Sequence, residues 1–269
     1  MCRWLAYSGP RLRMSELLFD PVNSLIRQSL SAQRGTVPTN GDGFGLGWYG
    51  ERKRPGLFRD TLPAWNDANL HDLAQQIAAP LFFAHVRAST GTATSRDNCH
   101  PFRLRNLLFM HNGEIGEFVR IRRDIEHLIK PEHYAHRHGT TDSEAFFLLA
   151  LGNGLAESPI DALATTVAQI EQMMVAADID APFTMTAAFS DGDGLVALRH
   201  SSNQKSPTLY YAMADHIQVD DGALSFVEGD GTVLVLSEPL DEADEPWQEV
   251  PEDHCLIARD GGVEVAPFA

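Results

Sequence analysis

The order in which strand and helix signals follow one another is the feature that most restricts the fold of this chain. Compact apolar runs at 81–86 and 107–111, each bounded by polar turns, predict two buried strands. Two consecutive helices are predicted after them, the first opened by the capping sequence Thr141–Glu144 and the second covering 158–177. Strand signals return from Phe183 onward. A chain that is β-rich, then helical, then β-rich predicts sheets packed face to face with helices outside.

The remaining segments complete this α+β pattern. A strand is predicted over 1–9, and the breaker pair Gly9-Pro10 is expected to end it. A short helix, broken at Pro21, is predicted over 15–31. The segment 40–50 alternates glycine with apolar residues, which predicts a strand that another backbone approaches closely. The later strands, separated by Gly/Asp turns, are predicted at 183–189, 195–199, 208–214, 232–236 and 255–258.

The chain shows no internal repeat, low-complexity segment or linker, so a single domain is expected over residues 1–269. The glycines of 40–50 do not form a phosphate loop. They lack the Lys-Ser/Thr pair of a Walker motif, and they do not follow a strand and open a helix as a dinucleotide fingerprint does. We therefore expect no cofactor.

Acidic residues outnumber basic ones by 37 to 21, which gives a formal net charge of −16. Nucleic acid is not an expected partner, because phosphate binding needs a basic face. Residues 215–260 hold 14 Asp and Glu against the single Arg259, and we interpret this stretch as a solvated acidic surface. No apolar run approaches the roughly 18 residues that a membrane span requires, so no membrane association is expected.

The cysteines indicate the compartment. Cys2, Cys99 and Cys255 are odd in number and unevenly spaced, which favours a reducing environment over a disulfide framework. The N-terminus also lacks the apolar core of a signal peptide. The chain is therefore expected in the cytoplasm. Cys99 and Cys255 have no adjacent base or partner motif, and we interpret both as structural.

Cys2 stands directly after the initiator Met1, and its small side chain is of the kind that permits removal of that methionine. A free α-amine has a pKa of roughly 7.7 to 8.0, so near neutral pH it can accept the proton of its own thiol. Nucleophile and base would then belong to one residue. A buried structural cysteine is the competing interpretation of Cys2 taken alone.

Six segments in chain order resemble the motifs of the class II glutamine amidotransferases, which are N-terminal-nucleophile hydrolases. They are Cys2–Gly9, Asp42–Tyr49, His85–Thr90, Asn98–Phe102, His111–Ile115 and Thr141–Glu144. Residues 236–251 look like the C-terminal part of the small stand-alone members. The resemblance implies the four-layer αββα sandwich of the N-terminal-nucleophile hydrolases, an α+β fold that agrees with the element order.

The resemblance also implies catalytic roles. Cys2 would attack the γ-carboxamide carbon of glutamine to form a γ-glutamyl thioester, which water then cleaves. The side-chain amide of Asn112 and the backbone N–H of Gly113 match the family's oxyanion hole. Each such donor contributes on the order of 3 kcal/mol to catalysis. An Asn-Gly pair between strands is more often a plain turn, so these roles depend on the joint pattern.

Substrate-binding roles follow from the same motifs. Arg87 matches the residue that grips the substrate α-carboxylate, which a guanidinium can bind with two prongs. Asp142 matches the acceptor for the α-ammonium, although a carboxylate in the first turn of a helix is also favoured by the helix dipole. Thr90 would act through its backbone. His100 also falls within a motif, and we interpret it as a packing residue.

Four histidines, at positions 127, 133, 136 and 138, raise the question of a metal. Their His-x-x-His-x-His spacing matches no closed zinc pattern, and no cysteine is near them in sequence. We interpret them as solvated or lid-forming side chains and expect no metal.

Three functions stay open at this point. The first is a free-standing hydrolase of γ-glutamyl amides, either glutaminase-like or related to the ergothioneine-pathway hydrolases that remove glutamate from a γ-glutamyl thiol compound. The second is a glutaminase subunit that delivers ammonia to a separate synthase partner, with the acidic C-terminal third as a contact face. The third is a catalytically silent γ-glutamyl-binding protein. The sequence marks neither the leaving group of the substrate nor the oligomeric state.

Overall fold

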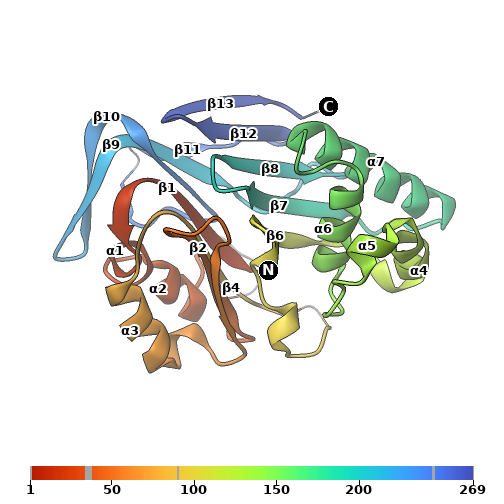
Figure 1. Cartoon of the computed structure of the whole chain (residues 1–269), viewed down its shortest axis with the longest axis horizontal. Helices are drawn as coiled ribbons and strands as arrows, with labels where there is room; N and C mark the ends of the chain where they lie inside the picture. Colours follow the sequence, from red (N-terminus) through yellow and green to blue (C-terminus); the bar gives the residue numbers. More distant parts are fainter. Residues whose placement is uncertain (1, 34–37, 90, 244–245, 269) are drawn as a thin grey trace.

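Two antiparallel sheets form the centre of the structure, a computed structural model that describes residues 2–33, 38–89, 91–243 and 246–268 (Figure 1). In the first sheet the strands lie in the order β11-β9-β10-β1-β4-β2-β3, and in the second in the order β13-β12-β8-β7-β6-β5. The first sheet contains β1 (Arg3–Arg13), β2 (Phe44–Tyr49), β3 (Gly56–Asp60), β4 (Ala78–Val86), β9 (Tyr210–Asp220), β10 (Ala223–Leu236) and β11 (Gln248–Glu249). The second contains β5 (Phe102–Leu104), β6 (Leu107–Ile115), β7 (Phe183–Ser190), β8 (Leu195–Ser201), β12 (His254–Arg259) and β13 (Gly262–Pro267).

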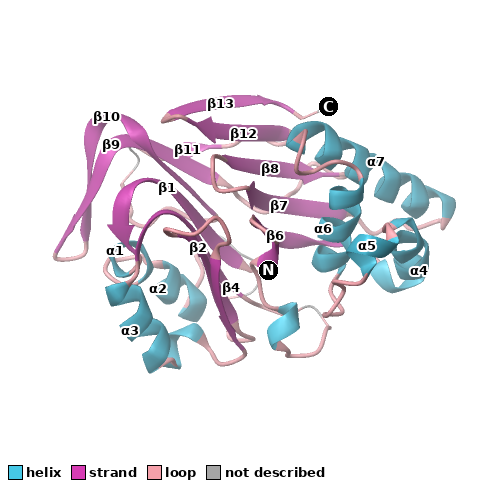
Figure 2. Cartoon of the chain, viewed as in Figure 1, coloured by secondary structure: helices cyan, strands magenta, loops and turns pink. Residues whose placement is uncertain are grey.

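The helices form an outer layer on each side of the paired sheets, as Figure 2 shows. One group consists of α1 (Ser15–Leu18), α2 (Leu25–Leu30) and α3 (Ala68–Gln76). The other consists of α4 (Phe118–Leu128), α5 (Pro131–Tyr134), α6 (Asp142–Gly152) and α7 (Pro159–Ala176). Three apolar cores result: one between the first helices and the first sheet, one between the sheets, and one between the second sheet and the other helices. The predicted four-layer αββα sandwich is confirmed.

The apolar core between the sheets includes residues from the start of the chain. Trp4 on β1 is fully buried there, together with Phe83 of β4 and Met110 of β6. The indole Nε1 of Trp4 donates a hydrogen bond of 3.2 Å to Thr186 Oγ1 on β7, so one side chain joins both sheets. A buried Trp needs such an acceptor for its N–H, and the bond fixes the beginning of β1 against the second sheet.

The first strand is longer than predicted. β1 continues through Gly9-Pro10 to Arg13, and its pairing with β4 resumes at Leu12 after a register shift. The breaker pair therefore produces an irregularity within the strand, because β4 offers partners on both sides of it. The strands predicted at 208–214 and 232–236 are also longer in the structure. They are β9 and β10, which form a hairpin that extends from the body of the molecule (Figure 1).

The helical prediction needs two corrections. Three helices were not predicted: α3, and α4 and α5, which precede the predicted pair α6 and α7 in a stretch that the sequence analysis marked only by its histidines. The capping box at Thr141 is half formed: Thr141 Oγ1 accepts from Glu144 N at 3.2 Å. The Glu144 carboxylate accepts instead from the backbone N–H groups of His138 and Gly139 and from Arg137, which draws the preceding loop onto the helix.

The glycine-rich strand is placed as predicted. A Cβ at Gly45 would lie 2.2 Å from the carbonyl oxygen of His100, so the loop before β5 packs directly on the backbone of β2. A Cβ at Gly47 would lie 2.8 Å from the Cγ atom of the Pro101 ring. The alternation of glycines therefore brings residues 100 and 101 against the first sheet. Among the described residues, no helix is long and apolar enough to cross a membrane.

Candidate active site

A cavity of about 290 Å³ opens where the two sheets meet the N-terminus of α6. Each of its walls comes from a different part of the sequence: the start of β1, the loop after β4, β6, the first turn of α6, and β7. Its lining consists of Cys2, Arg87, Ala88, Ser89, Thr92, His100, His111, Gly113, Glu114, Thr141, Asp142, Ser143 and Thr184. Four of the residues singled out in the sequence, Cys2, Arg87, Gly113 and Asp142, thus share one cavity.

Cys2 is positioned by the ladder between β1 and β4. Because Arg3 pairs with Val86, the residue before β1 lies next to the residues that follow β4. The Cys2 thiol donates to the carbonyl oxygen of Ala88 at 3.5 Å. Burial raises the pKa of this thiol above its ordinary value, although the hydrogen bond to Ala88 opposes the shift. A thiol in this state needs a nearby base to become a nucleophile at neutral pH.

The side chain of Arg3 also holds Cys2 in position. The guanidinium Nη1 donates to the Cys2 carbonyl oxygen at 2.8 Å, and Nε forms a 2.5 Å ion pair with Glu238. Both side chains of this pair are buried. In the sequence, Arg3 is notable only because it follows Cys2. Its partner Glu238 is 235 positions away, and no local pattern could predict that pairing.

Asn112 and Gly113 lie next to each other on β6, and only Gly113 lines the cavity. A Cβ at Gly113 would lie 1.9 Å from the Thr184 carbonyl oxygen, and its φ of 150° is one that other residues rarely adopt. The Asn112 side chain is buried, and its Nδ2 and Oδ1 have no hydrogen-bond partner among the described residues. A buried amide without partners is uncommon and calls for a specific explanation.

Arg87 is held by a set of groups to which the sequence analysis assigned no role. Its guanidinium donates to the Asp42 carbonyl oxygen at 3.2 Å, to Ser89 Oγ at 3.2 Å and to Thr92 Oγ1 at 2.6 Å. The Asp42 carboxylate accepts from Ser89 N at 2.7 Å and ties the loop after β4 to the loop before β2. The sequence feature that could have indicated these groups is the run of Ser and Thr that follows the strand predicted at 81–86.

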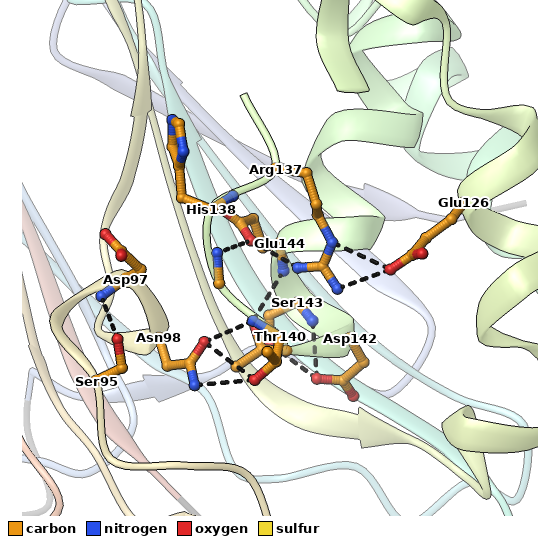
Figure 3. Close-up of polar contacts among 12 residues, drawn as sticks. Ser95, Asp97, Asn98, Glu126, Arg137, His138, Thr140, Asp142, Ser143 and Glu144 are labelled. Atoms are coloured by element: carbon orange, nitrogen blue, oxygen red, sulfur yellow. Dashed lines mark hydrogen bonds and ion pairs between the residues drawn. The ribbon is translucent and has the colours of Figure 1, made fainter. Parts of the chain in front are cut away.

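Asp142 opens α6 and faces both the cavity and the end of β6. Its Oδ2 accepts from Ile115 N at 2.9 Å. Its Oδ1 accepts from Ser143 N at 2.8 Å and from Ser143 Oγ (Figure 3). Ser143 Oγ also lies 2.8 Å from His111 Nδ1. Asp142 therefore accepts hydrogen bonds in the first turn of α6, where Thr141 is the N-cap residue, and it also lines the cavity.

Three buried histidines support the cavity. The rings of His85 and His100 are 4.3 Å apart, and His85 Nε2 lies 3.2 Å from the His111 carbonyl oxygen. Burial lowers the pKa of His85 to about 3, and it lowers the pKa of His100 and of His111 as well. These imidazoles are therefore neutral near pH 7. His100 also contacts Phe102, in agreement with its interpretation as a packing residue.

The loop around Asn98 forms one side of the site. Asn98 Nδ2 donates to Ala93 O at 2.8 Å. It also donates to Thr140 Oγ1 at 3.1 Å, and Asn98 Oδ1 accepts from Thr140 N at 2.8 Å (Figure 3). These bonds join the loop after β4 to the loop before α6. Thr90, which was expected to act through its backbone, lies outside the described residues.

No cluster of His, Cys, Asp and Glu suited to a metal ion occurs in the part of the chain that the structure describes. Of the four histidines singled out in the sequence, His127 and His133 belong to α4 and α5, and His136 and His138 lie in the loop before α6. None of the four lines the cavity that contains Cys2. Cys99 and Cys255 are buried and unpaired, and burial raises the pKa of both thiols.

The sandwich fold and this cavity define a class of protein. Residues 13–267 match the family model described as glutamine amidotransferases class-II, and the chain belongs to that family. The resemblance noted in the sequence is therefore confirmed.

Individual relatives agree with this assignment. The chain is 32% identical to the probable glutamine amidotransferase DUG3 of Saccharomyces cerevisiae, with 100% of this chain and 84% of the relative covered. It is 26% identical to the gamma-glutamyl-hercynylcysteine sulfoxide hydrolase of Mycolicibacterium smegmatis, with both chains covered completely. Among solved structures, a glutamine aminotransferase class-II domain protein from Silicibacter pomeroyi superposes with a TM-score of 0.75 at 34% identity, again over both whole chains. These names describe what the chain is similar to.

Proposed function

We propose that this chain hydrolyses the amide bond between a γ-glutamyl group and an amine, through a thioester on Cys2. The observation that carries the proposal is the meeting of Cys2, Arg87 and Asp142 in one cavity of about 290 Å³, from segments up to 140 positions apart. A cation and a carboxylate in the same cavity suit the α-carboxylate and α-ammonium of a glutamyl group. The similarity to a γ-glutamyl hydrolase over its full length supports this substrate class.

The first chemical step in this proposal is attack by Cys2 on the γ-carbonyl carbon. The α-amine of Cys2, freed by removal of Met1, takes the thiol proton and passes it to the leaving amine. The oxyanion is stabilised by the Gly113 N–H and by the Asn112 amide, whose unpartnered Nδ2 would then gain an acceptor. Water cleaves the thioester and releases glutamate. Three neutral histidines add no competing positive charge near the amine.

Two further assignments belong to the proposal. Residues 1–269 act as one amidotransferase domain, supported by a family match that reaches from residue 13 to residue 267. The cytoplasm is the proposed location, supported by three cysteines that are all free thiols. Delivery of ammonia to a synthase partner remains the alternative function. Steady turnover by the isolated chain would argue against it, and strong activation by a stably bound partner would favour it.

The test is glutamate release from glutamine and from a panel of γ-glutamyl amides and peptides. Cys2→Ala should abolish release, because the sulfur that forms the thioester is gone. Cys255→Ala removes a buried thiol on β12, and it should keep wild-type activity. Activity that survives in Cys2→Ala, or a substrate panel that yields no glutamate with the wild-type chain, would refute the proposal. Intact mass spectrometry of the active protein should show the loss of Met1.

A further inference from the structure

A second cavity, of about 490 Å³, lies at the edges of the two sheets and is lined by basic side chains. It is bounded by β3, the edge strand of the first sheet, and by β5, the edge strand of the second. The loop before α6 and the first turns of α6 complete it. We call it the basic cavity and define it by Arg54, Arg59, Arg103, Arg105, His136 and His138.

Concentration of positive charge is unexpected in a chain with a net charge of −16. The four guanidiniums come from two separate segments, 54–59 and 103–105, which the folding of the two sheets brings to one place. Like charges around one cavity repel, more weakly where the side chains are exposed, as those of Arg54 and Arg105 are, and a bound anion would relieve this repulsion. The pKa of Arg103 is lowered by burial and by its neighbours Arg54 and Arg59.

The carboxylates nearby are already occupied. Glu144, the acidic residue in the lining, accepts from Arg137 at 2.6 Å and from the backbone N–H groups of His138 and Gly139 (Figure 3). Arg137 also pairs with Glu126 at 3.3 Å. This network neutralises Glu144 from the side of the loop before α6, so Glu144 offers little to the arginines of the cavity.

The arginines have no comparable compensation. Within the described parts of the chain, neither Arg54 nor Arg105 forms an ion pair, and Arg103 donates to the carbonyl oxygen of Pro55 at 3.0 Å. Arg59 has one carboxylate, Asp97, at 3.5 Å, and half of that side chain is exposed. Beneath these charges lies an apolar floor made by Leu57, Phe102, Leu104, Phe147 and Leu148. Guanidiniums around such a floor suit a small molecule with clustered negative oxygens.

We propose that the basic cavity is a binding site for a small, multiply charged anion, one that carries a phosphate group or several carboxylates. It is separate from the site of the proposed hydrolysis, since the two cavities have no lining residue in common. The wall between them is the loop 97–102, because Arg59 donates to Cys99 O at 3.1 Å from one side and His100 lines the catalytic cavity from the other.

The experiment is isothermal titration of the whole protein with pyrophosphate and with citrate, each compared with sodium chloride at equal ionic strength. Pyrophosphate or citrate should bind, and the stronger of the two identifies the anion as phosphate-like or carboxylate-like. Arg54→Gln and Arg105→Asn should each weaken binding by about tenfold or more, since each removes a charge-assisted contact. Asparagine is chosen at position 105 because the backbone there has a φ of 54°.

Arg27→Gln is the matched control. Arg27 is an exposed arginine on α2, outside the basic cavity, and its replacement removes the same charge. It should leave the affinity unchanged. Absence of binding at millimolar pyrophosphate and citrate would overturn the proposal. Equal weakening by Arg27→Gln would overturn it as well, because the effect would then be one of overall charge. Binding is measured without any substrate, so the result does not depend on the proposed hydrolysis.

Discussion

At the scale of single residues, the site depends on polar groups that are held by partners both near and distant in sequence. Arg87 is held by Asp42 and Thr92, and Asp142 is held by Ile115 and Ser143. A charged side chain with several fixed partners keeps one orientation, which reduces the entropy lost when a substrate binds. The histidines next to these charges stay neutral because they are buried.

The neutral histidines predict how stability depends on pH. Their folded-state pKa values lie below the roughly 6.5 of an unfolded histidine, so the unfolded chain binds more protons below that pH. As far as these histidines are concerned, the free energy of unfolding is therefore highest above about pH 6.5, and it decreases as the pH falls towards their folded-state pKa values. For His85, whose pKa in the folded chain is about 3, the free energy of unfolding is expected to fall by on the order of 2 kcal/mol between pH 7 and pH 5. His100 and His111 change it in the same direction. Urea unfolding at both pH values measures this.

His100→Phe is the control for that prediction. The two ring nitrogens of His100 have no hydrogen-bond partner among the described residues, so phenylalanine loses no bond and keeps the contacts with His85 and Phe102. Its loss of stability between pH 7 and pH 5 should be smaller than that of the wild-type chain. An identical loss in both proteins would contradict the role of His100 in the pH dependence.

At the scale of elements, β2 positions the loop that carries His100. The glycines of this strand leave room for the backbone of residues 100 and 101, and the loop then continues into β5 and the second sheet. The sequence predicted a close approach here from the alternation of glycine alone. It did not identify what approaches, because the loop lies 55 positions further along the chain.

Gly45→Ala should therefore destabilise the protein by about 1–3 kcal/mol, because its Cβ would lie 2.2 Å from the His100 carbonyl oxygen and the backbone has to move. Gly50→Ala is the matched substitution, since a Cβ there meets nothing within 4 Å. It should stay within about 0.5 kcal/mol of the wild-type chain. Chemical denaturation of the three proteins compares these values. Equal stability of both variants would show that the close approach at Gly45 is not restrictive.

At the scale of the whole molecule, the strand that follows Cys2 pairs in the first sheet with a strand from late in the sequence. β1 lies between β4 and β10, so the strand that follows Cys2 is central to this sheet. The buried pair of Arg3 and Glu238 joins them where β10 ends. Since Arg3 also holds the Cys2 carbonyl group, folding of the C-terminal part orders the residue that carries the nucleophile in our proposal.

Glu238→Ala is expected to reduce the free energy of unfolding by about 3–5 kcal/mol, because it leaves the Arg3 guanidinium buried without its carboxylate. Arg122→Ala breaks a partly exposed pair with Glu126 on α4 and should cost less than about 1 kcal/mol. Thermal or urea unfolding of both variants measures the difference. Similar small losses in the two would mean that the buried pair adds little to stability.

The sequence by itself determined the family, the succession of a β-rich, a helical and a second β-rich part, and the residues proposed for the chemistry. Local patterns were sufficient for this, because strand alternation, helix caps and the segments around Cys2, Arg87 and Asp142 are all short-range features. Where local signals were weak, the prediction failed, as for α4 and for the continuation of β1 past Gly9-Pro10.

Tertiary structure alone decided which groups share a site. The partner of Arg3 is 235 positions away, and the four arginines of the basic cavity come from two segments, around β3 and β5, on different sheets. Likewise, only burial makes His85, His100 and His111 neutral. Pairing across sheets and loss of water both depend on the packed molecule, whereas a sequence pattern records only neighbours along the chain.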